Sequence, residues 1–71
     1  MDPNANLDEQ ERTLGKLEML SGESVNAWRA RVRHDAARLA ELRQALYDWI
    51  RDGGFEPDWT RAPYARKHYG R

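Results

Sequence analysis

The chain has 71 residues, with twelve Lys and Arg against twelve Asp and Glu and no cysteine, so its formal net charge at pH 7 is zero. This length allows one domain with a core of marginal size, and the lack of cysteine excludes disulfides and thiolate metal sites. The balanced charge argues against a surface built as a whole to attract polyanions. No apolar run approaches the ~18 residues of a membrane span, and the first residues do not resemble a signal peptide, so we expect neither membrane insertion nor export.

The first predicted helix covers about residues 5–20. Two starts compete for it: Asp2 as N-cap with Pro3 in the first helical position, or Asn6 as N-cap with Glu9 three residues later. Four leucines then share one side of the helix: Leu7, Leu14, Leu17 and Leu20. Residues 21–24 follow as a turn with a serine N-cap, so the next helix is expected to run antiparallel beside the first.

The second predicted helix covers about residues 24–52 and is the longest element. Along it, apolar residues and one acid recur in steps of three and four, as in a coiled coil: Val25, Trp28, Val32, Asp35, Leu39, Leu42, Leu46 and Trp49. Because the first helix is about half as long, we expect it to cover this seam only as far as about Leu39. An apolar stripe made of Leu42, Leu46, Trp49 and Ile50 is therefore expected to stay exposed.

An aromatic hook is predicted for residues 53–60. Gly53 and Gly54 suit the end of a helix, and Phe55 and Trp59 follow closely enough to contact its last turn. Residues 61–71 are basic and interrupted by proline, and we expect them to form a flexible tail. The predicted organisation is therefore a helical hairpin with a folded-back hook over residues 1–60, and a flexible basic tail over residues 61–71.

The predicted fold class is all-α, an antiparallel helical hairpin with an aromatic C-terminal hook. The exposed stripe needs a cover, and a twofold pairing of two long helices would provide one by forming a four-helix bundle. We therefore expect a protein–protein interaction module that binds a second copy or a host protein. The predicted interface consists of Leu42, Leu46, Trp49, Ile50, Phe55 and Trp59.

The sequence shows no pattern that indicates catalysis. His34 and His68 are the only histidines, and no acid-rich or histidine cluster at metal-ligand spacing accompanies either of them. The glycines at 53 and 54 end a helix, whereas phosphate-binding loops precede one. We therefore expect no enzymatic activity, no metal, no cofactor and no small-molecule substrate.

Nucleic-acid binding is the alternative function. Seven basic residues could contact phosphates, and those near the C-terminus alternate with tyrosines that could stack on bases: Arg29, Arg31, Arg33, Arg38, Arg66, Lys67 and Arg71. The acidic first helix would repel the same backbone, and pairing with that helix is the simpler explanation for the arginines.

Several short motifs resemble those of small uncharacterised proteins encoded by actinobacteriophages and occasionally by their hosts. They are Asp2-Pro3-Asn4, the Leu-Ala-Glu-Leu of residues 39–42, Leu46, Trp49, the Gly-Gly-Phe of residues 53–55, Pro57 and Trp59. The resemblance covers about half the chain and leaves out the arginine-dense residues 29–38. It implies a small phage-type accessory or host-interaction protein in the cytoplasm of a bacterial host cell, without an activity that could be carried over.

Overall fold

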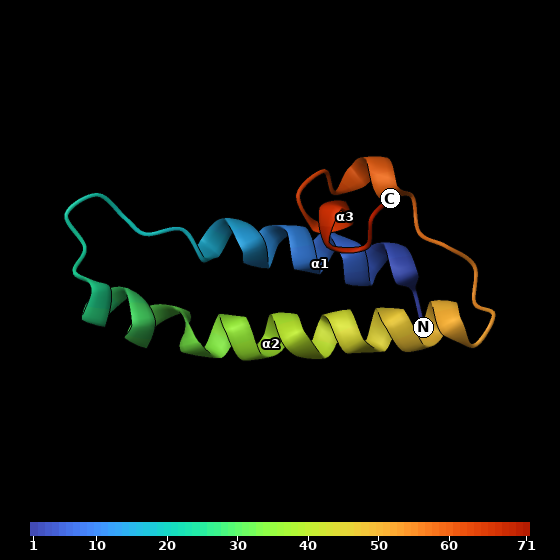
Figure 1. The fold of residues 1–71 in the computed structure, drawn as a ribbon, viewed down its shortest axis with the longest axis horizontal. Helices are drawn as coiled ribbons and strands as arrows, with labels where there is room; N and C mark the ends of the chain where they lie inside the picture. Colours follow the sequence, from blue (N-terminus) through green and yellow to red (C-terminus); the bar gives the residue numbers. More distant parts are fainter.

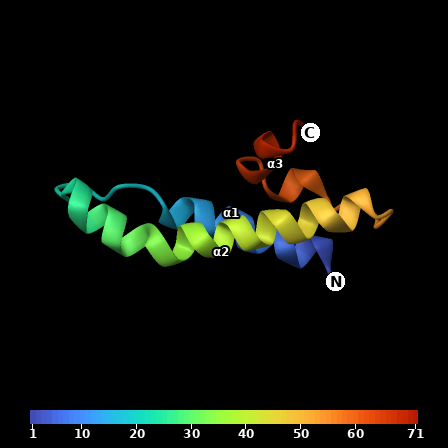
Figure 2. The same ribbon diagram turned by 60° about the horizontal axis from the view of Figure 1, so that its bottom comes forward.

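The computed structural model describes all residues 1–71 and contains only helices and connecting segments. Its elements are α1 (Pro3–Lys16), α2 (Val25–Arg51), a short 3-10 helix η1 (Trp59–Arg61) and α3 (Ala65–His68). The first two helices lie antiparallel and side by side, and the C-terminal segment returns from the end of α2 to lie on α1 (Figures 1 and 2). The all-α helical hairpin predicted from the sequence is therefore confirmed.

Helix α1 begins as the first of the two competing predictions describes. The Asp2 carboxylate accepts hydrogen bonds from the backbone N–H groups of Asn4 at 3.0 Å and Ala5 at 3.2 Å, and Pro3 occupies the first helical position. The helix ends at Lys16, about four residues earlier than predicted. The connection to α2 is correspondingly longer than the four-residue turn that the sequence indicated.

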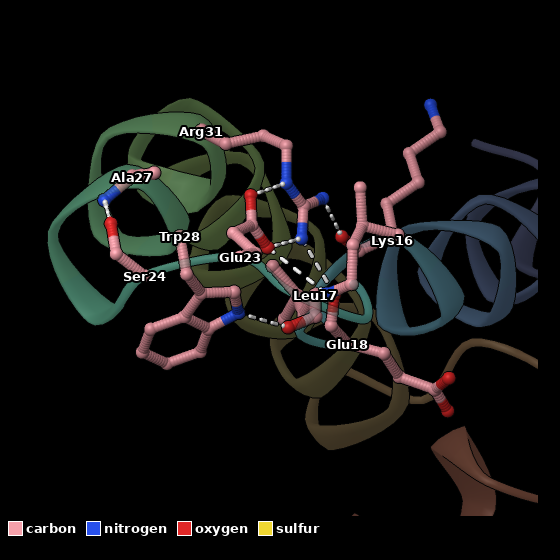
Figure 3. Close-up of polar contacts among 9 residues, drawn as sticks. Lys16, Leu17, Glu18, Glu23, Ser24, Ala27, Trp28 and Arg31 are labelled. Carbon is pink, nitrogen blue, oxygen red and sulfur yellow. Dashed lines mark hydrogen bonds and ion pairs between the residues drawn. The ribbon is translucent and has the colours of Figure 1, made fainter.

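Side chains of α2 explain this early end. The carbonyl oxygens of Lys16 and Glu18 accept hydrogen bonds from the Arg31 guanidinium at 2.8 and 2.6 Å, and the Leu17 carbonyl accepts one from Trp28 Nε1 at 2.7 Å (Figure 3). A continuing helix would have bonded these carbonyls to N–H groups further along α1. Because α2 satisfies them instead, the chain can leave the helix without orphaned polar groups.

Helix α2 has the predicted extent. The Ser24 hydroxyl accepts a hydrogen bond from the Ala27 N–H at 3.1 Å, which caps the N-terminus of the helix. At the other end Gly53 has φ +94°, the left-handed conformation that only glycine adopts without strain after a helix.

The core lies where the C-terminal segment meets both helices. Its fully buried members come from three parts of the chain, with Leu7 on α1, Leu46 on α2, and Ala62 and Ala65 in the C-terminal segment. Residues 61–71 thus do not form the flexible tail that we predicted. They include the whole of α3, and the side chains of Ala62 and Ala65 are buried against the leucines, which gives the segment a packed position.

Candidate interaction surface

The predicted stripe is mostly buried within the single chain. Leu42 is 5% exposed and Leu46 is fully buried, so the prediction that these two residues are free for a partner is wrong. The cause is the register of the hairpin: the Asn6 side chain donates a hydrogen bond to the Leu42 carbonyl at 3.0 Å, which places the start of α1 beside the C-terminal half of α2. Trp49 and Ile50 are half-buried against the same core.

The two aromatic residues of the predicted hook behave differently. Trp59 is half-buried against the core, as the hook requires. Phe55 remains 63% exposed, and its ring lies edge-on to the Trp49 indole at 5.6 Å between ring centroids. The Trp49 Nε1 donates to the Phe55 carbonyl at 2.9 Å, so the backbone at this position, more than the phenyl ring, holds the hook to α2.

A buried polar network joins the C-terminal segment to both long helices, and the sequence reasoning missed it. Gln10 is fully buried, and its Nε2 donates to Asn6 Oδ1 at 2.7 Å and to the Tyr69 hydroxyl at 2.8 Å. The same hydroxyl donates to Gln10 Oε1 at 3.0 Å, and burial raises the pKa of Tyr69 despite this bond. The available signal was the line Pro3, Asn6, Gln10 and Thr13, which recurs in steps of three and four along α1.

Three of the seven basic residues of the nucleic-acid alternative are paired with acids of the chain. Arg31 is paired with Glu23 at 2.8 Å, Arg38 with Glu9 at 3.1 Å and with Glu41 at 3.4 Å, and Arg71 with Glu56 at a similarly short distance. The other four form no ion pair within the chain: Arg29, Arg33, Arg66 and Lys67. Pairing within the chain therefore accounts for three of the seven, and only Arg38 pairs with an acid of the first helix, as the simpler explanation expected.

Arg31 is the centre of a clamp that holds the connection between α1 and α2. Its guanidinium contacts both Glu23 carboxylate oxygens at 2.8 and 2.9 Å in addition to the two carbonyls described above (Figure 3). Hydrogen bonds from Arg31 and from the Leu20 N–H lower the pKa of Glu23 to about 2. The clamp thus fixes a segment whose outer side is apolar.

That apolar side consists of three half-exposed residues at the end of the hairpin: Met19 at 48%, Leu20 at 59% and Val25 at 50% exposure. A tight turn lies between Leu20 and Val25. The Glu23 N–H donates to the Leu20 carbonyl at 3.0 Å and closes the turn, in which Gly22 has φ +79°. Turns and connections usually carry polar residues, and large apolar side chains on such a segment need a further explanation.

One side of the hairpin faces the C-terminal segment, and we call it the tail side. On α1 it contains Glu11, whose carboxylate accepts from the N–H groups of Tyr64 at 3.2 Å and Ala65 at 2.8 Å. On α2 it contains Tyr47, whose ring lies 4.8 Å from that of Tyr69 between centroids. By helical spacing, the tail side of α1 also carries Leu14 and Glu18. The tail side of α2 also carries, from the middle of the helix toward its N-terminus, Ala36, Val32, Arg29 and Val25.

The C-terminal segment covers only part of the tail side. Where it stops, a groove of about 430 Å³ opens on α1, lined by Glu11, Leu14, Gly15, Glu18 and Tyr64. The Tyr64 ring, 69% exposed, forms one wall of the groove. Apart from its two neighbours in the chain and the backbone of its own helix, no atom lies within 4 Å of the place where a Cβ on Gly15 would sit, so the floor of the groove is open. The candidate interaction surface is this groove together with Met19, Leu20 and Val25.

The chain contains no group of three or more His, Cys, Asp or Glu side chains placed to hold a metal ion. None of its helices combines the length and the apolar character that crossing a membrane requires. The chain matches no protein-family model, no curated protein and no solved structure.

Proposed function

We propose that this chain is a non-catalytic protein–protein interaction module, a small phage-type accessory protein that acts in the cytoplasm of a bacterial host. The observation that carries the proposal is the apolar end of the hairpin, where Met19, Leu20 and Val25 are each about half exposed. The Arg31 clamp holds this segment in place before any partner arrives. Such pre-organisation lowers the entropic cost of binding, because the segment need not be ordered on contact.

The groove supports the same proposal. It is concave and contains an apolar floor at Leu14 and Gly15, an aromatic wall at Tyr64, and carboxylates of Glu11 and Glu18 at its edges. This combination of an apolar centre and a charged rim is typical of protein interfaces. A side chain that enters the groove would bury apolar surface, and a cation at its rim would meet the acids.

Affinity capture from an actinobacterial host lysate tests the proposal. We expect the immobilised chain to retain a protein partner, and Leu14→Glu or Val25→Glu to abolish retention because each places a charge on the candidate surface. Ala30→Glu is the matched control, since Ala30 is exposed and five residues from Val25, about 140° around α2. Retention by wild type and by all three variants alike would contradict the proposed surface.

The nucleic-acid alternative gives a different result in a mobility-shift assay. A chain that contacts several phosphates should lose affinity by orders of magnitude between about 50 and 200 mM salt, whereas apolar docking depends little on salt. We expect no retarded species with nonspecific DNA even at the lower salt concentration. A salt-sensitive shift that Arg29→Ala and Arg33→Ala both weaken would favour the alternative over our proposal.

A further inference from the structure

The groove on α1 is negatively charged at its rim and apolar at its centre. Glu11 and Glu18 are among its lining residues, no lysine or arginine lines it, and Leu14 and Gly15 lie between the two acids in the chain. The groove also lies at the last turn of α1, and the C-terminus of a helix carries a partial negative charge that favours a cation. The electrostatics of this place therefore favour a positively charged ligand.

The two carboxylates of the groove are held in different ways. Each oxygen of Glu11 accepts one backbone N–H, from Tyr64 at 3.2 Å and from Ala65 at 2.8 Å, so this carboxylate is fixed and keeps lone pairs for a further donor. Glu18 is exposed and forms no ion pair, and its carboxylate points away from the Arg31 guanidinium that binds its carbonyl (Figure 3). Glu18 is therefore the acid that is free to meet a partner.

The basic residues of the chain do not neutralise these acids. Arg12 and Lys16 directly follow lining residues, and Lys67 Nζ lies 5.6 Å from the centroid of the Tyr64 ring. None of the three lines the groove or forms an ion pair. The Lys16 side chain leaves α1 on the opposite side from the Glu18 carboxylate (Figure 3). A cation in the groove thus has to come from another molecule.

We propose that the groove takes an arginine side chain of the partner protein. The methylene groups of this arginine lie on Leu14 and over Gly15, and its guanidinium pairs with Glu18 beside the Tyr64 ring. Glu11 adds a second negative charge to the same groove. A guanidinium is planar, so it can bond a carboxylate through two hydrogen bonds and stack on an aromatic ring, which the compact ammonium of lysine does not do.

Gly15 provides the space for the methylene groups. Its missing Cβ leaves room that no side chain of the folded chain fills, and its φ is not among the positive values, so the fold itself does not require glycine here. Glycine in a helix costs stability relative to alanine. A side chain that lies across α1 at this position uses the open floor.

The arginine belongs to a protein rather than to a free amine. Met19 and Leu20 directly follow Glu18 in the chain, and their large apolar side chains are about half exposed. A small cation leaves them in contact with water, whereas the residues that flank an arginine in a partner can cover them. The inference rests on the proposed function and deepens it, because it names the chemistry by which the same surface recognises its partner.

An NMR titration of the full ¹⁵N-labelled chain with the peptide acetyl-Gly-Arg-Gly-amide tests the inference. We expect the amide signals of Leu14, Gly15, Glu18 and Tyr64 to shift, with a dissociation constant of about 1–10 mM, the scale of one exposed ion pair with a small apolar contact. The same peptide with citrulline, which has nearly the same shape without the charge, should bind at least ~10-fold more weakly. The lysine peptide should bind about threefold more weakly than the arginine peptide.

Two variants separate the charge of the groove from its shape. Glu18→Gln should weaken the arginine peptide about fivefold or more, because it removes the free carboxylate. Gly15→Leu should abolish binding without removing a charge, since the new side chain fills the open floor. Leucine is a good helix former, so circular dichroism should show this variant at least as helical as wild type.

Glu41→Gln is the matched control, because it removes the same charge from a side chain that is 71% exposed and does not line the groove. It should bind the arginine peptide as wild type does. Equal weakening in Glu41→Gln and Glu18→Gln would show that only the overall charge of the chain attracts the peptide, and would overturn the inference.

Four other results would also overturn it: no shift of the groove signals with the arginine peptide, equal binding of the citrulline peptide, equal binding of the lysine peptide, or unchanged binding in Gly15→Leu. Sedimentation equilibrium of the chain alone tests a second copy as the occupant. A dimer that Gly15→Leu dissociates would assign the groove to that copy and overturn the inference.

The failure of the inference is distinguishable from that of the proposed function. A chain that captures a host protein through Leu14 and Val25 but does not bind the arginine peptide loses only the inference. A chain that binds the peptide but captures no protein keeps the arginine site and loses the proposed host partner, and a chain that does neither loses both.

Discussion

Removing the hydroxyl of Tyr69 tests whether the buried polar network fastens the C-terminal segment. In Tyr69→Phe the ring stays, but Gln10, which is fully buried, loses its partner for Oε1 and one of the two partners of Nε2. A buried polar group left unsatisfied costs about 1–3 kcal/mol, so we expect the free energy of unfolding to fall by about that amount. For a domain of this size each ~1 kcal/mol lowers Tm by about 4–8 °C.

Tyr64→Phe is the matched control, because it removes the same atom from a tyrosine that is 69% exposed and whose hydroxyl forms no hydrogen bond within the chain. Its effect should stay within about 0.5 kcal/mol. Urea unfolding of dilute protein, followed by circular dichroism and tryptophan fluorescence, measures both variants. Equal changes in the two variants, or no change in Tyr69→Phe, would refute the reasoning that the network stabilises the docked segment.

Three further predictions concern the clamp and the glycines. The pKa of Glu23 is about 2 in the folded chain and 4.5 ordinarily, so between these pH values the unfolded chain binds more protons than the folded chain. The stability contributed by the pairing of Glu23 with Arg31 should therefore be lost as pH falls through this window. NMR titration should place the Glu23 midpoint near pH 2, and a midpoint at its ordinary value would contradict the clamp. Gly54→Ala should lower the Tm in thermal unfolding, because the Trp49 indole occupies the space of the new Cβ. An unchanged Tm would show that the ring moves freely. Gly15→Ala should raise monomer stability by about 1 kcal/mol in urea unfolding, since nothing opposes its Cβ, and a loss of stability would reveal an unseen contact within α1.

The helix ends that are set by residues nearby in the sequence were predictable from the sequence. Ser24 as N-cap and Gly53 after the last turn bound α2 where the pattern places it, and Asp2 with Pro3 starts α1 as one of the two predicted alternatives. These signals lie within one turn of the residue that they affect, so the chain carries them without reference to its tertiary structure.

The tertiary structure decided how α1 and α2 align and what covers them. A seam that repeats every three or four residues offers similar apolar contacts to a helix shifted by a turn or more, so periodicity alone does not set the register. Here Asn6 bonds the Leu42 carbonyl and Glu9 pairs with Arg38, which moves α1 toward the C-terminal half of α2 and buries the leucines that the sequence left exposed.

The sequence did not predict the burial of the C-terminal segment either, because this burial also depends on contacts between distant residues. Ala62 and Ala65 are too small to form an apolar pattern, yet both are buried in the core, and Tyr69 finds its partner Gln10 at a distance of 59 residues along the chain. The sequence by itself therefore determined the two long helices and most of their ends, but neither η1 nor α3. The contacts between distant residues decided which apolar surface is buried and which, on the tail side and at the end of the hairpin, remains exposed.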